Sequence, residues 1–471
     1  YVGSVTVDDL RKDDSLAVGK QIGKSGLEAV YEKQLRGQDG NQTYEVNAVG
    51  MKQRVVSTTE PISGNDIETS LDPYLTEFAA QALGDQRGSI IITDAQTGKI
   101  LTMASKPTFD PNVMTQSFVE KDKEAQRKEQ IQNFFQDPEK LFFDRAISGA
   151  YPPGSIFKIA TSLAGLENGA VTESTQVIDA GKIQVGVSEF GNWYFRQYGK
   201  VEGALSIIKA IARSNDIFFY KTAEWTGPEK VAAMAREIGL GAKTGIDLPA
   251  ETAGLIPDPE WKRRTRQEKW FLGDTYHMGI GQGDILTSPI QVAQMTQTMA
   301  NNGSLCSVSL NATAPPSCRL VNIKQSDLNL VLRGMIGACS KGGTAYPFFP
   351  YNTTKVGEVN VESDTTDPQH LLDQGAIGCK TGTAEFGAAD AKGNRKTHAW
   401  FTSIIGMPDQ WGTASLGDEL HQKWIQKVRE HGFPKRIVIT VMIESNDLNP
   451  FMEGSKDGGT LTKKIVDWLV Q

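Results

Sequence analysis

The order of the apolar segments predicts an α+β fold built around one central antiparallel sheet flanked by helices. Apolar runs at 89–93 and 99–103 flank a turn sequence at 94–98, a pattern typical of a β-hairpin. A continuous apolar run at 436–443 predicts a late strand, and a terminal helix is expected at about 459–470. Because helical segments fill the interval, we expect the late strands to pair with the early hairpin.

Residues 1–75 predict a smaller N-terminal α+β domain, which we call the pedestal, ahead of a main domain at 76–471. This first region is polar, with short β-like pieces at 44–49 and 54–57 and helical spacing at 27–35. A chain of 471 residues is long enough for two or three domains of roughly 150 residues each.

Helical periodicity recurs through the main domain. The helices expected from it are 71–83, 155–166, 204–212, 231–238 and 289–300. The densely charged segment at 121–127 is predicted to be a solvated helix, in a region that is otherwise poor in strand signals.

Charge and hydropathy exclude some classes of function. The formal net charge of −7 argues against non-specific nucleic-acid binding, which needs a basic face. The basic stretch at 262–266 is interpreted as a solvated loop rather than a binding patch. The sequence has no apolar run of about 18 residues, so no membrane span is predicted, and no signal peptide opens it. The start at Tyr1 rather than Met suggests a trimmed chain or a mature ectodomain, which leaves an anchor in the full-length protein open.

The cysteines predict one disulfide and no metal site. Cys306 and Cys318 bracket a polar, turn-rich loop, so we predict that they are bridged, which implies an oxidising compartment. Cys379 is expected to be a half-cystine or a small buried apolar residue rather than a catalytic thiol. Four cysteines, the fourth being Cys339, allow three pairings among which sequence does not choose. No spacing of Cys or His is typical of a metal site.

Ser155 and Lys158 form a Ser-x-x-Lys motif on a predicted helix, where positions i and i+3 share a face. Serine is a poor nucleophile until a base takes its proton, and a desolvated lysine near other cations has a lowered pKa suited to that task. The Pro-Pro-Gly at 152–154 places Ser155 at the helix N-terminus, where free N–H groups favour an oxyanion. Taken alone, such a motif is expected about once or twice by chance in a chain of this size.

Ser214, Asn215 and Asp216 supply a hydroxyl, an amide and a carboxylate after a predicted helix. The Ser214 hydroxyl is expected to relay a proton between Lys158 and a leaving amine, and the Asp216 carboxylate to order Lys158 or accept from a substrate amide. Asn215 is assigned to substrate binding. Without the other motifs, the three residues are better explained as an ordinary helix N-cap.

Lys380, Thr381, Gly382 and Thr383 supply a cation and two hydroxyls on one predicted strand. Gly382 would allow a ligand backbone to approach closely, and the Thr383 N–H would complete an oxyanion hole with that of Ser155. The alternative explanation, without a catalytic role, is an ordinary strand end whose lysine is solvated. Other nucleophile systems fit less well, because the chain has no Gly-x-Ser-x-Gly elbow and its few histidines read as structural.

Together, the three motifs occur in the order that is the signature of penicillin-binding proteins and serine β-lactamases. Their flanks agree: 145–155, 279–283 and 287–289, together with Ser25 to Gly37 in the pedestal, resemble class B penicillin-binding proteins. The resemblance covers nearly the whole chain and is strongest to the elongation-type D,D-transpeptidases.

This resemblance implies a transpeptidase domain on an extended pedestal. Ser155 would attack the penultimate D-Ala carbonyl of a peptidoglycan stem peptide, and a neighbouring stem's amine would resolve the acyl-enzyme. Lys158 would be the base and Ser214 the relay, while Lys380, Thr381 and Thr383 would hold the substrate carboxylate. β-Lactam antibiotics would acylate Ser155 as substrate mimics, and no cofactor or metal is implied.

The resemblance also implies where such a protein works. It would lie at the periplasmic, extracytoplasmic face of the inner membrane, held by a single N-terminal helix that this chain lacks. Its expected partners are a SEDS-type glycan polymerase and the elongation complex.

The sequence departs from the family pattern at two positions, and three other functions remain as alternatives. The middle motif ends in Asp216 rather than the commoner Asn, and Glu385 stands where Gln is common, which adds a carboxylate that could weaken binding of anionic ligands. The alternatives are a β-lactamase, a β-lactam sensor or inactive scaffold, and a division-type class B enzyme. The long pedestal argues against the first, and the intact motifs argue against the second.

Overall fold

A five-stranded antiparallel sheet forms the centre of the main domain, in the order β13-β14-β15-β5-β6. The early hairpin is β5 (Gly88–Asp94) and β6 (Ile100–Lys106), and the late strands are β13 (Ile377–Phe386), β14 (Lys396–Gly406) and β15 (Arg436–Ile443). β15 pairs with β5, which confirms the predicted pairing of late strands with the early hairpin. β13 is an edge strand, so one side of it is free to face other elements.

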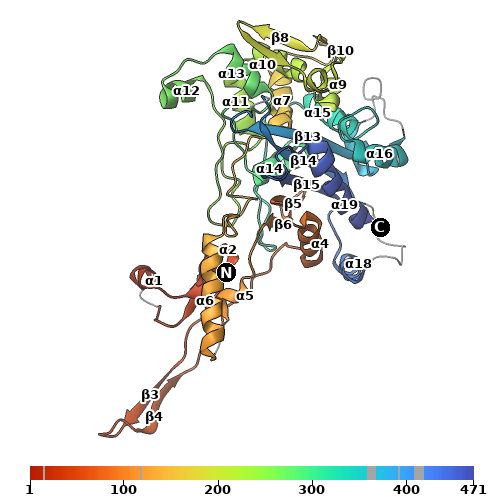
Figure 1. Ribbon diagram of the computed structural model, residues 1–471. Coiled ribbons are helices and arrows are strands. Elements are labelled where there is room, and N and C mark those ends of the chain that lie inside the picture. The colour runs from red at the N-terminus through yellow and green to blue at the C-terminus, as the bar shows by residue number, and fades with distance from the viewer. Residues whose placement is uncertain (14–15, 117–118, 358–366, 391–392, 408–417, 471) are drawn as a thin grey trace.

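The computed structural model describes residues 1–471 except 14–15, 117–118, 358–366, 391–392, 408–417 and 471. The main domain sits at one end of an elongated molecule, and the pedestal extends away from it (Figure 1). Within the described residues, no helix is long and apolar enough to cross a membrane.

Alternate residues of the sheet belong to two different apolar cores, because successive side chains of a strand point to opposite faces. Phe401 packs with α4 (Pro73–Leu83), α18 (Glu419–His431) and α19 (Gly459–Val470). Its neighbour Trp400 packs with a second, larger core. The helices of that core are α7 (Lys158–Glu167), α9 (Ile207–Arg213), α10 (Asp216–Thr226), α11 (Pro228–Glu237), α13 (Leu272–Gly279), α14 (Pro289–Ala300) and α15 (Gln325–Ala338).

Shorter elements surround the second core and the edge of the sheet. These are η1 (Gly154–Phe157), β7 (Val177–Asp179), β8 (Lys182–Val185), β9 (Ser188–Gly191), α8 (Trp193–Tyr198), β10 (Gly203–Leu205), α12 (Pro259–Arg266), β11 (Ser304–Cys306), β12 (Cys318–Leu320), η2 (Tyr346–Phe348), α16 (Phe349–Val356), α17 (Pro368–Asp373) and η3 (Gly454–Gly458).

The pedestal packs against an excursion of the chain that follows β6 and carries α5 and α6 (Figure 1). Tyr1 packs against Phe109 and Phe142, with ring centroids 5.8 and 5.7 Å away. The elements are β1 (Val2–Ser4), α1 (Val7–Lys12), β2 (Gln21–Gly23), α2 (Gly26–Val30), α3 (Glu32–Leu35), β3 (Asn41–Val46), β4 (Lys52–Thr59), α5 (Asn112–Thr115) and α6 (Lys121–Gln136).

Three helix predictions need correction at their ends. The helix expected at 204–212 is preceded by β10, and α9 begins after Ser206, whose hydroxyl accepts from the Lys209 N–H at 3.3 Å. The charged helix expected at 121–127 continues to Gln136 as α6. The helix expected at 155–166 opens with the tighter turn η1. Caps and tertiary contacts decide these ends, which periodicity alone does not show.

Both disulfides lie in the main domain. Cys306–Cys318, which joins β11 to β12, confirms the sequence prediction. Cys339–Cys379 joins the end of α15 to β13, one residue before Lys380, so Cys379 is a half-cystine.

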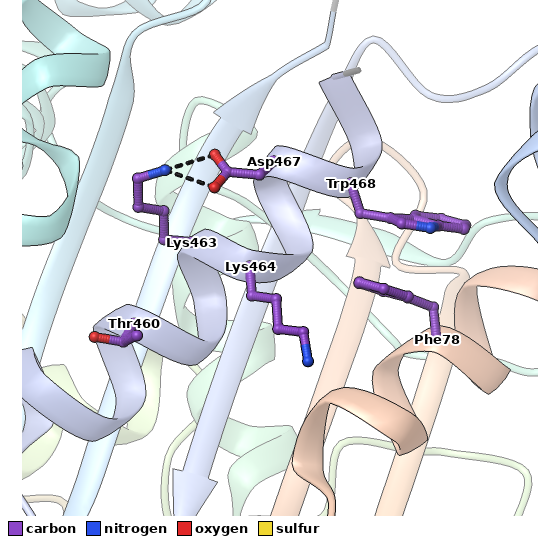
Figure 2. Close-up of a pocket in the computed structure, with 6 residues that line it drawn as sticks. All are labelled: Phe78, Thr460, Lys463, Lys464, Asp467 and Trp468. Carbon is purple, nitrogen blue, oxygen red and sulfur yellow. Dashed lines mark hydrogen bonds and ion pairs between the residues drawn. The ribbon is translucent and has the colours of Figure 1, made fainter. Parts of the chain in front are cut away.

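A surface hollow of about 420 Å³ lies where α4 meets α19 (Figure 2). Its lining includes Phe78, which stacks on Trp468 with ring centroids 4.5 Å apart, and Lys463, which donates to Asp467. None of its lining residues belongs to the three motifs, so this hollow is separate from the predicted site.

Candidate active site

The three motifs meet where η1, the junction of α9 and α10, and the edge strand β13 come together. Lys158, Ser214, Asp216 and Lys380 form one hydrogen-bonded cluster, although Ser214 and Lys380 are 166 positions apart along the chain. The sequence prediction that these segments assemble is therefore matched by the geometry.

Ser155 lies in the first turn of η1, half-buried. Gly154 before it has a φ of 52°, a left-handed conformation that favours glycine. The Gly154 N–H donates to the Gly281 carbonyl at 2.9 Å, and a Cβ at position 154 would lie 2.9 Å from the Thr383 carbonyl oxygen. Ser155 is thus held directly beside β13.

Lys158 is fully buried at the start of α7. Its Nζ donates to Asp216 Oδ1 at 2.7 Å, to the Ser214 carbonyl at 2.7 Å and to Ser214 Oγ at 3.3 Å. Burial lowers the pKa of the Lys158 ammonium from its ordinary value, and the Asp216 carboxylate opposes this shift. Among the described residues, the Ser155 hydroxyl makes no side-chain hydrogen bond.

Ser214 ends α9 in a left-handed conformation with a φ of 53°. Few residues other than glycine adopt this conformation, and such strain is concentrated at functional sites. Here it directs the hydroxyl between the two lysines, because Ser214 Oγ accepts from Lys380 Nζ at 2.9 Å as well as from Lys158. Ser214 is the link between the first and third motifs.

Asp216 begins α10 and uses both carboxylate oxygens. Oδ1 accepts from Lys158, and Oδ2 accepts from the backbone N–H of Trp193 at 2.8 Å. The Asp216 N–H donates to the Asn192 side chain at 3.1 Å. The carboxylate is therefore fixed from two sides and orders Lys158, one of the two roles expected for it.

Asn215 faces away from this cluster, contrary to its assignment to substrate binding. Its Oδ1 caps α10 by accepting from the Phe218 N–H at 2.9 Å. Its Nδ2 donates to Asp179 at 2.8 Å and to Glu202 at 3.0 Å. The Asn215 side chain is fully buried and its amide is engaged by these protein groups. Asn215 therefore acts as an ordinary helix N-cap, which was the alternative explanation of this motif.

Lys380 is also fully buried and points at the second motif. Its Nζ donates to Ser214 Oγ and to the Thr381 carbonyl, both at 2.9 Å. Burial lowers its pKa well below the ordinary value, and the nearby Lys158 charge lowers it further. Two lysines with lowered pKa values around one carboxylate are a charge arrangement typical of catalytic sites.

The rest of the third motif divides into buried and exposed parts. The Thr381 hydroxyl lies 2.9 Å from that of Thr344, while Thr383 is exposed and its hydroxyl accepts from the Gly454 N–H at 3.2 Å. A Cβ on Gly382 would lie 2.9 Å from both Ile156 and the Pro153 carbonyl. Gly382 therefore allows η1, rather than only a ligand, to approach β13.

Sequence reasoning missed several residues that support the site. Asn192, Trp193, Asp179 and Glu202 hold the second motif, and Thr344 contacts the third. They belong to short strands, loops and the first turn of the short helix α8, without a recognisable pattern, so no sequence signal marks them. His398 was expected to be structural; it stacks on Phe386 and accepts from the Ser445 N–H.

Glu385 does not stand as an isolated carboxylate. Arg196 approaches it to 3.9 Å, with both side chains about half-exposed. With its amide nitrogen towards the Glu385 carbonyl, Gln282 also pairs with both backbone groups of Glu385, at 3.1 and 3.0 Å. Within the described residues, no group of three or more His, Cys, Asp or Glu side chains is arranged to hold a metal ion.

The fold and the cluster define a serine–lysine acyl-transfer class of site, and comparisons with known proteins identify the family. The penicillin-binding protein transpeptidase domain model matches residues 88–411, and the penicillin-binding protein dimerisation domain model matches residues 1–69. The chain belongs to the penicillin-binding protein transpeptidase family, and its relatives place it with the class B proteins of the PBP2 type.

Curated relatives include two proteins named peptidoglycan D,D-transpeptidase MrdA. The one from Acinetobacter baumannii is 36% identical over 64% of this chain and 44% of its own length. The one from Haemophilus influenzae is 26% identical over 100% of this chain and 67% of its own length. This chain spans about half the length of the first curated relatives that it matches, between 44% and 58%.

Solved structures agree over nearly the whole chain. PBP2 of Helicobacter pylori, in a complex with MreC, has a TM-score of 0.75 and 28% identity, covering 99% of this chain and 76% of that one. PBP2 of Pseudomonas aeruginosa, in complex with WCK 5153, has a TM-score of 0.74 and 27% identity, covering 99% and 86%.

Proposed function

We propose that this protein is an elongation-type peptidoglycan D,D-transpeptidase that cross-links stem peptides through an acyl-enzyme on Ser155. The single observation that carries the proposal is the buried cluster in which Ser214 links Lys158 to Lys380 beside Asp216. Its relatives named D,D-transpeptidase MrdA support the choice of reaction.

In the first step, Ser155 Oγ forms a bond to the penultimate D-Ala carbonyl and the bond to the terminal D-Ala nitrogen breaks. Lys158 in its neutral form accepts the hydroxyl proton, which its lowered pKa favours. The proton reaches the leaving amine through Ser214, whose hydroxyl already contacts both lysines. An amine of a neighbouring stem then attacks the ester and releases Ser155.

Binding and charge stabilisation come from β13 and η1. The N–H groups of Ser155 and Thr383 would form the oxyanion hole. Lys380, Thr381 and Thr383 would bind the substrate carboxylate, for which the exposed Thr383 hydroxyl is well placed. Asn215 is left out of this role because its amide is engaged elsewhere.

Labelling with a fluorescent penicillin tests the proposal. We expect one covalent adduct on Ser155, located by mass spectrometry, that disappears in Ser155→Ala. Ser326→Ala is the matched control, because Ser326 is exposed at the start of α15 and its hydroxyl donates to Asp327. Labelling that persists in Ser155→Ala would show that the nucleophile is misassigned.

The same adduct separates the proposed function from a β-lactamase. A transpeptidase holds the acyl-enzyme because it lacks an efficient deacylating base for water, so nitrocefin should give about one product per enzyme in the first minutes. Continuous rapid turnover of nitrocefin would instead favour a β-lactamase.

The proposal extends to location, partners and domain organisation. Two disulfides fit the oxidising, extracytoplasmic side of the inner membrane, where a single-pass anchor would hold the full-length protein. A SEDS-type polymerase and the elongation complex are the proposed partners, since one similar structure contains MreC and another is described as a peptidoglycan synthase complex. The division into a pedestal at 1–75 and a transpeptidase domain at 76–471 is also proposed, with α5 and α6 as an insertion that packs on the pedestal.

A further inference from the structure

The segment that carries the nucleophile reaches it from the pedestal. After β6 the chain passes through α5 and α6, and residues 137–151, which we call the return segment, then lead back to η1 (Figure 1). At the pedestal end, Phe142 packs against Phe109 with ring centroids 4.2 Å apart. At the other end, three residues separate Tyr151 from Ser155. A displacement of the return segment at Tyr151 would therefore also displace Ser155.

The return segment is anchored at Glu444, which directly follows the central strand β15. The Tyr151 hydroxyl donates to Glu444 Oε1 at 2.6 Å, and Arg145 Nε lies 3.1 Å from Oε2. Arg87 Nε lies 3.6 Å from the same oxygen. The side chains of Arg145 and Glu444 are only 4% and 13% exposed, so water does not compete strongly for this carboxylate.

Further contacts tie the same segment to the sheet. The Arg145 backbone N–H donates to Ser105 Oγ of β6 at 2.9 Å, and its guanidinium donates to the Glu139 carbonyl at 2.9 Å. Arg87 pairs with Glu139 at 3.2 Å as well as with Glu444. The anchor is a network rather than one isolated hydrogen bond.

The Tyr151 ring packs closely against Gly149, where any side chain would take up the space of the ring. A Cβ on Gly149 would lie 2.3 to 2.6 Å from three atoms of the Tyr151 side chain, one of them the hydroxyl oxygen. The Tyr151 backbone exchanges two hydrogen bonds with Thr287, at 2.9 and 2.8 Å. The next carbonyl, of Pro152, accepts from Trp400 Nε1 at 2.9 Å. Placement of Tyr151 thus sets the start of the Pro-Pro-Gly turn that presents Ser155.

We propose that Tyr151 and Glu444 are positioning residues for Ser155. Their contact fastens the return segment to the centre of the sheet, so that Ser155 keeps its place against β13 when the pedestal moves. The physical reason is that acyl transfer needs a near-attack geometry, which small displacements of the nucleophile destroy. This inference rests on the assignment of Ser155 as the nucleophile.

The chain contains a matched control for the Tyr151 contact. Tyr276 of α13 is also buried, and its hydroxyl donates to Glu224 Oε2 at the same 2.6 Å. The Tyr276–Glu224 contact joins α13 to α10, so both of its residues lie outside η1, β13 and the return segment. Tyr151→Phe and Tyr276→Phe therefore remove the same chemical group at different places, each from a contact with a glutamate, although Glu224 is more exposed (30%) than Glu444 (13%).

The experiment compares acylation by a fluorescent penicillin in the two variants of the 471-residue chain. Varying the drug concentration separates the non-covalent Kd from the acylation rate constant. We expect Tyr151→Phe to lower the rate constant about tenfold with Kd unchanged, less than the roughly hundredfold cost of a 1 Å misplacement. Tyr276→Phe should change the rate constant less than twofold.

A second variant tests the same Tyr151–Glu444 contact without changing either residue. Gly149→Ala should displace the Tyr151 ring without altering either partner's chemistry, and should slow acylation at least as much as Tyr151→Phe. Equal rates in Tyr151→Phe and wild type, or equal slowing in both tyrosine variants, would overturn the proposal. An unlabelled wild type would instead refute the proposed function, so the two failures are distinguishable.

Discussion

Two ion pairs of this molecule have similar distances between their charged atoms, but one pair is buried and the other is exposed to solvent. Lys158 and Asp216 lie 2.7 Å apart in the active-site cluster, with side chains 0% and 11% exposed. Arg54 and Glu45 lie 2.5 Å apart on the β3–β4 hairpin of the pedestal, 76% and 51% exposed. Distance alone would rank the two pairs as equals.

The two pairs differ in their burial and in whether their members are hydrogen-bonded to other charged groups. Removing one partner of a buried pair leaves a charge without its counterion, which costs about 3–5 kcal/mol, whereas an exposed pair contributes about 0–1 kcal/mol. The buried pair is also connected through Ser214 to a second lysine, so a change there alters the charge state of the whole site. A short contact therefore indicates function only where water is excluded.

The largest effect is expected from Asp216→Asn. The variant removes the carboxylate that orients Lys158 and offsets the two buried lysine charges, so acylation of Ser155 should fall by about 100-fold or more. Stopped-flow acylation measures it, and urea unfolding reports the accompanying loss of stability. Asp467→Asn, which removes the partner of Lys463 at the surface, is the control. Acylation within threefold of wild type would contradict the role given to Asp216.

An intermediate effect is expected from protonation of His398, which lies on β14 with its ring centroid 5.5 Å from that of Tyr151. Burial lowers the pKa of His398 to about 4. The unfolded imidazole takes up its proton near pH 6.5 and the folded one only near 4, so the unfolded state binds more protons in this window. Stability is therefore lost as pH falls from about 6.5 to 4, by about 3 kcal/mol.

His398→Asn isolates this contribution, since asparagine can still accept from the Ser445 N–H and does not titrate. Urea unfolding at pH 7 and pH 4 should show a smaller loss of stability in the variant than in wild type. NMR titration of the imidazole gives the pKa directly. A His398 that titrates near its ordinary value in the folded protein would refute the prediction.

The smallest effect is expected at the exposed pair. Arg54→Ala should change the free energy of unfolding by less than about 0.5 kcal/mol and leave acylation unchanged, because solvent screens the pair. Urea unfolding and penicillin labelling check both. A loss above about 1 kcal/mol would show that the hairpin pair is worth more than its exposure indicates.

Much of the site was readable from local sequence. Ser155 and Lys158 are three residues apart on the consecutive turns of η1 and α7, and Lys380 to Thr383 lie on one strand, so each set is local in the sequence, although successive side chains of a strand point to opposite faces. Asn215 shows the limit of such reading. Which way its amide faces depends on Asp179 and Glu202, which come from other elements and which its own neighbours in sequence do not specify.

The sequence by itself determined the fold class, the early and late strands of the sheet and the three chemical motifs, because periodicity, turn composition and short spacings are local properties. It favoured a Cys306–Cys318 bridge, which the structure confirms. The tertiary structure decided the burial that lowers the pKa values of the two lysines, the left-handed turn at Ser214, the bridge to Cys379 and the Tyr151–Glu444 anchor. These depend on contacts between residues far apart in sequence, where solvent exclusion and packing choose the partners.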